Sequence, residues 1–143
     1  EMSFEAAKHM VPQRSGKIIN ICSMFSFLGG RLSSAYAATK HGIAGLTKAY
    51  CDELAEHNIQ VNGIAPGLVY VSGPQTGDNF ERARSVNLLR SPIDPDDVAR
   101  TAVFLAENDS ITGITVAVDK GQHLVPLERD IMFVAEQLAP PPP

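Results

Sequence analysis

Residues 16–23 read GKIINICS, and this short stretch decides how the rest of the chain is interpreted. The run from Lys17 to Ile21 is rich in β-branched residues and apolar on both faces, which is typical of a strand inside a sheet. Two further apolar runs, 59–65 and 114–118, share this character, and helical sequence lies before and between the three runs. The alternation predicts an α/β fold, with a parallel sheet that helices cover on both sides.

Three main helices are predicted around these strands. The first spans 1–13, and the second runs from Ser33 or Ser34 to about residue 57. The third begins at Asp94, where an N-cap residue, a proline and acidic residues of the first turn come together, and it runs to about residue 108. Loops are predicted at 23–34 and 68–93, the latter with a short helix near 78–87. The second helix carries a core-facing stripe of Ile43, Leu46, Tyr50 and Leu54.

Composition favours an ordinary globular domain and disfavours several classes of function. The chain has 143 residues, of which 44% are hydrophobic and 20% charged, and its net charge of −4 is spread without a basic block. Such a surface does not favour nucleic acid or anionic lipid, and no apolar run reaches the length of about 18 residues that spans a membrane. Cys22 and Cys51 lack metal-site spacing. We therefore expect no metal, and a reducing compartment, the cytoplasm.

Tyr36 and Lys40 lie four residues apart in the second predicted helix, so their side chains share one face. A phenol is a poor proton donor at neutral pH, and a neighbouring ammonium favours its ionised form. Ser23 precedes this pair, directly after the first predicted strand. By chance a Tyr-x-x-x-Lys pair arises in about one such chain in ten, and the same pair with Ser23 in about one in a hundred. The three residues indicate a candidate site for proton transfer.

Several motifs in a fixed order extend this pattern, and together they resemble the short-chain dehydrogenase/reductase family. After GKIINICS come AYAATKHG at 35–42 and VNGIAPG at 61–67, where Pro-Gly follows a strand at the sheet edge that binds ligands in open α/β folds. The resemblance covers about residues 1–124. Its later motifs are DDVA at 96–99, FL at 104–105, ITG at 111–113 and VDKG at 118–121.

The resemblance implies a role for each matching position. Tyr36 matches the general acid that protonates the substrate carbonyl oxygen, and Lys40 matches the lysine that binds the nicotinamide ribose and assists the tyrosine. Ser23 matches the serine that hydrogen-bonds the carbonyl. The segment of Pro66, Gly67 and Val69 matches the part of the family that lines the nicotinamide. The implied cofactor is NAD(P), with NADP expected ahead of NAD, and the implied reaction is hydride transfer.

Other features of the family are expected upstream of Glu1, among them its glycine-rich phosphate turn and a catalytic asparagine. The 143 residues then correspond to the C-terminal half of a doubly wound Rossmann fold, that is, its last three parallel strands with flanking helices. We expect this partial domain over residues 1–124 and a tail over 125–143. The isolated piece is expected to be inactive, with the outer edge of its first strand unpaired. Val71 stands where many members have threonine, and Lys120 replaces a glycine in a turn that favours positive φ.

Substrate and assembly stay open at this stage. The loop after Gly67 is more similar to the branch of the family that reduces pterins and dihydrofolate than to the branch that reduces acyl thioesters. Tyr70 or Phe80 would stack on a flat ring, and Gln75 or Asn79 would pair with its amide edge, although these residues also suit a purely structural loop. The full-length form is expected to be a homo-oligomer, either a dimer or a tetramer. The alternative is a truncated, non-catalytic remnant that acts only by association with full-length subunits.

Overall fold

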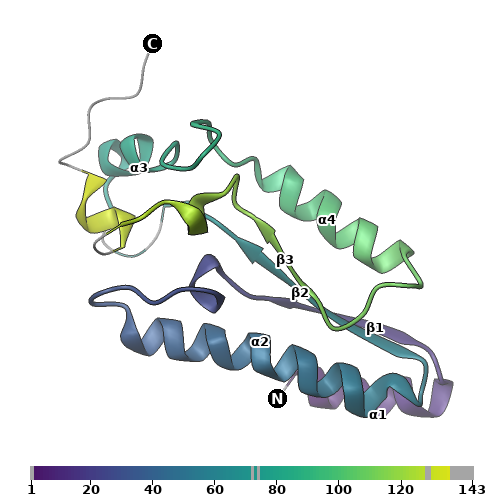
Figure 1. Cartoon of the computed structure of the whole chain (residues 1–143). Helices are drawn as coiled ribbons and strands as arrows, with labels where there is room; N and C mark the ends of the chain where they lie inside the picture. The colour runs from purple at the N-terminus through teal and green to yellow at the C-terminus, as the bar shows by residue number, and fades with distance from the viewer. Residues whose placement is uncertain (1, 72, 74, 128–129, 136–143) are drawn as a thin grey trace.

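A three-stranded parallel sheet forms the centre of the computed structural model, which describes residues 2–71, 73, 75–127 and 130–135 (Figure 1). The strand order is β1-β2-β3, so the middle strand pairs on both sides. Ile18 lies opposite Val61 in one ladder, and Ile64 lies opposite Val116 in the other. The predicted parallel α/β sheet is thus confirmed. The strands are β1 (Gly16–Ile21), β2 (Ile59–Pro66) and β3 (Thr115–Val118).

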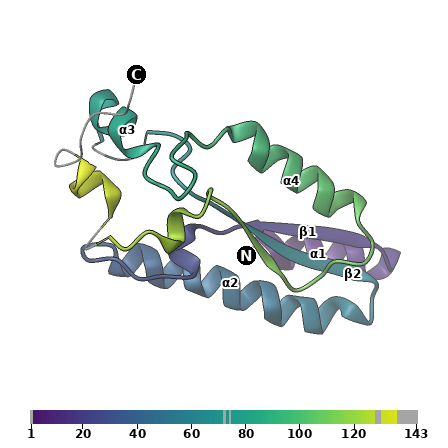
Figure 2. The same ribbon diagram turned by 45° about the horizontal axis from the view of Figure 1, so that its top comes forward.

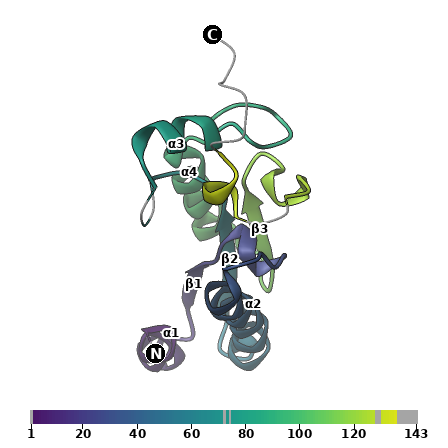
Figure 3. The ribbon, with the colours of Figure 1, turned by 90° about the vertical axis from the view of Figure 1, so that its left-hand side faces the viewer.

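Helices cover both faces of this sheet. Seen along the strands, α1 (Met2–Gln13) and α2 (Ser34–Ala55) lie on one face, and α4 (Pro95–Glu107) lies on the other (Figure 3). Asp94 caps α4 by accepting a hydrogen bond from the Asp96 N–H, at 2.9 Å, as its sequence predicts. Beyond the carboxyl ends of the strands lie α3 (Gly77–Ala83) and three short 3₁₀ helices, η1 (Met24–Ser26), η2 (Gln122–Leu124) and η3 (Ile131–Phe133).

Two details of the helices differ from the sequence prediction. The predicted core-facing stripe of α2 is wrong at Leu46, which is 37% exposed, whereas Thr47 is fully buried. The Thr47 hydroxyl accepts a hydrogen bond from the Asn20 side chain and donates one to the Ile43 carbonyl, so a polar contact turns this face of α2 toward β1. Ser33 occupies the N-cap position of α2, but its side chain makes no capping hydrogen bond.

The core consists of three clusters of buried apolar residues, to which the helices and the tail contribute. The main cluster, between α1, α2 and the sheet, contains Ile18, Leu54 and Val61. At the carboxyl edge of the sheet η1 packs on α2, and farther out Ile131 and Ala135 of the tail pack on Ala83. The apolar tail residues therefore cover a surface of this same chain. Within the described residues no helix is long and apolar enough to cross a membrane.

The outer edge of β1 has no partner strand among the described residues. Lys17, at the start of this strand, is tied across the sheet to the loop that precedes β3. Its ammonium donates to the Asn108 carbonyl at 2.9 Å and to the Asp109 carboxylate at 2.7 Å. The hydrogen bond from Lys17 lowers the pKa of Asp109 below its usual range.

Candidate active site

A cavity of about 990 Å³ opens at the carboxyl edge of the sheet and brings together most of the predicted site residues. In the ribbon of Figure 2, α2 lies on one side of this edge, and α3 and α4 lie on the other. Its walls come from the ends of β1 and β2, the first turn of α2, one side of α4 and the tail. Ser23, Tyr36, Pro66, Gly67 and Val69 all line it. Lys40 does not line the cavity and lies one turn farther along α2. The structure therefore brings together residues that are far apart in the sequence.

Ser23 is held where β1 gives way to η1. Its side-chain oxygen accepts a hydrogen bond from the Phe25 N–H at 3.3 Å, so the hydroxyl proton remains available for donation into the cavity. Ser26 then fixes this turn against α2. The Ser26 hydroxyl accepts from the Ser23 N–H at 3.3 Å and donates to the Lys40 carbonyl at 2.8 Å. Sequence reasoning missed Ser26, because the usual sequence signature of such a reciprocal cap has Glu or Gln at this position rather than serine.

Tyr36 and Lys40 share one face of α2, as their spacing predicts. The Tyr36 ring is 49% exposed and packs edge-on against Phe25, with 5.7 Å between the ring centroids. The Lys40 ammonium lies 5.7 Å from the centroid of the Tyr36 ring and donates to the Ile21 carbonyl at 3.0 Å. A three-proton donor keeps two further protons after this bond. The end of β1 thus anchors the ammonium beside the tyrosine.

The Pro66–Val69 wall is shaped by close packing around Gly67. A Cβ at this position would lie only 2.7 Å from Ile93 Cδ1 and 2.8 Å from Asp119 Cβ, so any larger residue would force the surrounding packing to shift. Next to it, the Leu68 N–H donates to Gln122 Oε1 at 2.7 Å. Gln122 is 1% exposed, so its buried amide fixes the backbone of the Pro66–Val69 segment on the side away from the cavity. Sequence reasoning missed Gln122, since no motif distinguishes a supporting glutamine.

The turn after β3 that carries Gln122 is held by its own side chains. The buried Asp119 carboxylate accepts from the Gly121 N–H at 2.9 Å and from His123 Nδ1 at 2.6 Å. Lys120 has φ 52° and Gly121 has φ 77°, so the positive φ expected in this turn is confirmed. The Lys120 ammonium donates hydrogen bonds to Ser91 Oγ at 2.8 Å and to the Pro92 carbonyl at 2.6 Å, which fix its side chain against the loop before α4.

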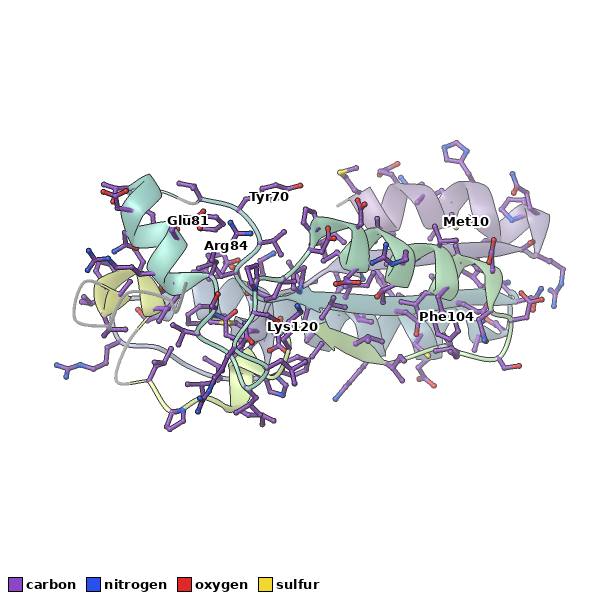
Figure 4. The ribbon with its side chains drawn as sticks, turned by 90° about the horizontal axis from the view of Figure 1, so that it is seen from above. Met10, Tyr70, Glu81, Arg84, Phe104 and Lys120 are labelled. Carbon is purple, nitrogen blue, oxygen red and sulfur yellow. The ribbon has the colours of Figure 1, made fainter. Side chains whose placement is uncertain are left out.

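Of the four residues predicted to hold a flat substrate, two line the cavity. Tyr70 lines it but is 68% exposed, and its side chain projects outward from the loop (Figure 4). Gln75 also lines it and is buried, with 7% exposure. Phe80 instead packs beneath Arg84, with the guanidinium 5.4 Å from the ring centroid, and Asn79 is buried in contacts with the tail. No cluster of three or more His, Cys, Asp or Glu side chains lies together in the part of the chain that the structure describes.

Comparison with known proteins identifies the class to which this fold and site belong. The family model described as enoyl-(acyl carrier protein) reductase matches residues 1–123. The chain belongs to the short-chain dehydrogenase/reductase family. The predicted Rossmann-type fold and family are therefore confirmed.

Individual relatives agree in both sequence and structure. YgcW of Escherichia coli (strain K12), described as an uncharacterized oxidoreductase, is 52% identical over 130 residues, which are 85% of this chain and 49% of YgcW. The 2-dehydro-3-deoxy-D-gluconate 5-dehydrogenase of Bacillus subtilis (strain 168) is 43% identical over 81% of this chain and 48% of its own length. The solved structure of ElxO with NADP bound superposes with a TM-score of 0.71 at 32% identity, over 82% of this chain and 50% of ElxO. The chain spans about half the length of the relatives it matches.

Proposed function

We propose that this chain is the catalytic part of an NAD(P)-dependent oxidoreductase that transfers hydride between nicotinamide and a carbonyl, an alcohol or a pterin-like substrate. Ser23, Tyr36 and Lys40 are its catalytic residues. The observation that carries this proposal is their convergence. The Ser23 and Tyr36 side chains line one cavity at the carboxyl edge of the sheet, and the Lys40 ammonium is held beside the Tyr36 ring.

The contacts of these three residues support distinct roles in moving a proton. The Tyr36 hydroxyl gives its proton to the substrate oxygen, and the Lys40 ammonium stabilises the phenolate that is left. Ser23 already accepts a hydrogen bond from the Phe25 N–H, so its own proton points to the developing negative charge on the substrate oxygen. The Ser26 bridge keeps these groups on the same side of the cavity.

The carboxyl-edge walls suit a nicotinamide nucleotide, which supplies the hydride when it is bound. Pro66, Gly67 and Val69 form a compact apolar wall for the ring, and the free donors of the Lys40 ammonium suit ribose hydroxyls. Between the two forms of the cofactor we propose NADP, in line with the NADP bound to ElxO. Comparison of KM for NADPH and NADH tests this choice, and a lower KM for NADH would contradict it.

A Tyr36→Phe variant tests the central assignment. The variant keeps the ring and its contact with Phe25 but has no proton to give, so turnover should fall by a factor of about 10² to 10⁴ with the fold unchanged. Tyr50→Phe on the same helix is the matched control and should keep normal turnover. Both are assayed by NADPH oxidation in a protein that carries the cofactor-binding half as well. Near-normal activity of Tyr36→Phe would refute the assignment.

For the substrate of this enzyme we propose a flat, pterin-like compound. Tyr70 and Gln75 in the cavity wall support a flat, pterin-like compound, whereas several relatives are named for keto sugar acids. A screen would compare dihydropterins and dihydrofolate with acetoacetyl thioesters, steroids and sugars. A preference for a thioester or a sugar by more than about tenfold would end the pterin assignment and leave Tyr36 and Lys40 in their roles.

The environment and assembly of the enzyme follow from surface features. Cys22 and Cys51 are both free thiols, which supports a reducing compartment, the cytoplasm. On α4, Val103 and Phe104 are each 54% exposed. Figure 4 marks the position of Phe104 on this helix. Apolar side chains of this size support a homo-oligomer, a dimer or a tetramer, which light scattering would detect.

A second candidate function is that of a non-catalytic remnant, and one specific observation favours it. The outer edge of β1 has no strand partner in the described part of the chain, so this edge offers a place for another subunit. Co-expression of residues 1–143 with a full-length relative tests this function. Recovery of a stable mixed complex without activity of the chain's own site would support it.

A further inference from the structure

One side chain that lines the cavity has a polar atom without a partner. Gln75 lines the cavity and is 7% exposed, and its side-chain oxygen is buried with no hydrogen-bond partner within the described structure. Buried amide oxygens are nearly always paired, because an unpaired one loses its bond to water without replacement. An unpaired acceptor on a residue that lines a cavity therefore points to a ligand that supplies the donor.

The direction of this amide is fixed by a chain of contacts that ends at the backbone. The Met132 carbonyl can only accept, so the Asn79 side chain must face it with its nitrogen, at 2.9 Å. The Asn79 oxygen then accepts from Gln75 Nε2 at 2.8 Å. Rotation of the Gln75 amide would place its oxygen against the Asn79 oxygen, so the Gln75 nitrogen stays toward Asn79. Its oxygen is consequently committed as an acceptor.

The rest of the lining constrains the charge of the ligand. Asp130 is the single charged residue among the described residues that line the cavity, and none of them is lysine or arginine. Aliphatic and aromatic side chains such as Phe25, Val69 and Phe133 make up much of the remainder. A carboxylate or phosphate would find no positive partner on these walls, whereas a neutral compound would lose little by leaving water.

We propose that Gln75 is a specificity-determining residue, whose side-chain oxygen accepts a hydrogen bond from a hydroxyl or N–H group of a neutral substrate. This inference rests on the proposed function, because it takes the cavity to be the substrate site. Asn79 and the backbone carbonyl of the tail residue Met132 act as positioning groups, since they orient the Gln75 amide. The tail thus takes part in substrate choice through its backbone.

A matched pair of neutral ketones tests the contact, with NADPH oxidation as the readout in a protein that carries both halves of the fold. The pair is 4-hydroxycyclohexanone and cyclohexanone, which differ by one hydroxyl. In the wild type kcat/KM should be about tenfold higher for the hydroxylated ketone, the value of one net hydrogen bond. Gln75→Met should bring this ratio close to one by lowering kcat/KM for the hydroxylated ketone alone. Gln13→Met, exposed at the end of α1, is the control and should keep the wild-type ratio.

The outcomes separate this inference from the function on which it rests. A wild-type ratio near one would overturn the role of Gln75 even if the variant does not fold, and so would an equal loss for both ketones in Gln75→Met. A preference of more than about tenfold for 5-keto-D-gluconate over the neutral ketone would overturn the neutral-substrate assignment. A dihydropterin whose turnover depends on Gln75 would identify the donor as N–H. Absence of NADPH oxidation with every compound would instead count against the proposed function itself.

Discussion

At the scale of single residues, Lys40 connects the backbone of the sheet to the chemistry of α2. Its ammonium is fixed by the Ile21 carbonyl at the end of β1, so its position beside Tyr36 does not depend on a free side-chain rotamer. A lysine side chain that is already ordered by a backbone contact loses less conformational entropy when a ligand binds than a flexible one does. Lys40 is thus placed in advance both for the ribose and for the phenolate.

Lys40→Met is expected to impair cofactor binding and turnover together. Methionine keeps much of the aliphatic stem but has no charge and no donors, so KM for NADPH should rise by about tenfold and kcat should fall by at least as much. Steady-state kinetics measure both constants. Lys48→Met, exposed on the same helix, should leave them unchanged. A variant that loses only cofactor affinity would show that Lys40 does not assist Tyr36.

At the scale of elements, the sequence predicts each strand and the long helices well, because apolar runs and capping residues act locally. It does not predict which helix covers which face of the sheet. Strands that advance in one direction across a sheet have their crossover helices on the same face when both crossovers take the usual hand. Here α2 and α4 lie on opposite faces, so one crossover has the uncommon hand. Tertiary packing decides this, and no local pattern records it.

The site divides in the same way between local and distant contacts. Tyr36 and Lys40 could be predicted because helical spacing alone brings them together. Gln122 and Ser26 could not be predicted, because they support the site through hydrogen bonds with Leu68 and Lys40, which are distant in the sequence. The pairing of Asn79 with the tail was missed for the same reason, and it removes Asn79 from the predicted substrate contacts.

Gly67→Ala tests how tightly the end of β2 packs against the turn after β3. The added methyl group would meet Ile93 and Asp119 at less than normal contact distance, so the free energy of unfolding should fall by about 1–3 kcal/mol. KM for NADPH should rise with it, since this wall lines the proposed nicotinamide site. Denaturant unfolding and steady-state kinetics measure the two effects.

The matched control for Gly67→Ala is the same substitution at Gly45, which lies in α2 with open space around its Cα. Alanine there should raise the free energy of unfolding by about 0.5–1 kcal/mol, because it favours the helix without a clash. Equal destabilisation by both substitutions would show that Gly67 is not under special constraint.

At the scale of the whole molecule, residues 1–143 hold the proposed catalytic groups on about half the length of the relatives. The phosphate-binding turn of the family does not occur among these residues. Expressed alone, the chain should therefore show no measurable binding of NADH or NADPH, and its unpaired β1 edge should promote aggregation. Calorimetric titration and light scattering check the two expectations. Micromolar binding of NADPH by the chain alone would contradict the first.

The position of β2 between two parallel neighbours also governs when the molecule can fold. β2 pairs with residues that lie about 40 to 50 positions away along the chain on either side, so each ladder requires closure of a long loop. On the ribosome, the apolar strand β2 emerges long before Thr115–Val118 exists to cover its second edge. Native pairing at the second edge of the central strand is therefore a late event of synthesis, and until β3 is made this edge stays open to association with other strands.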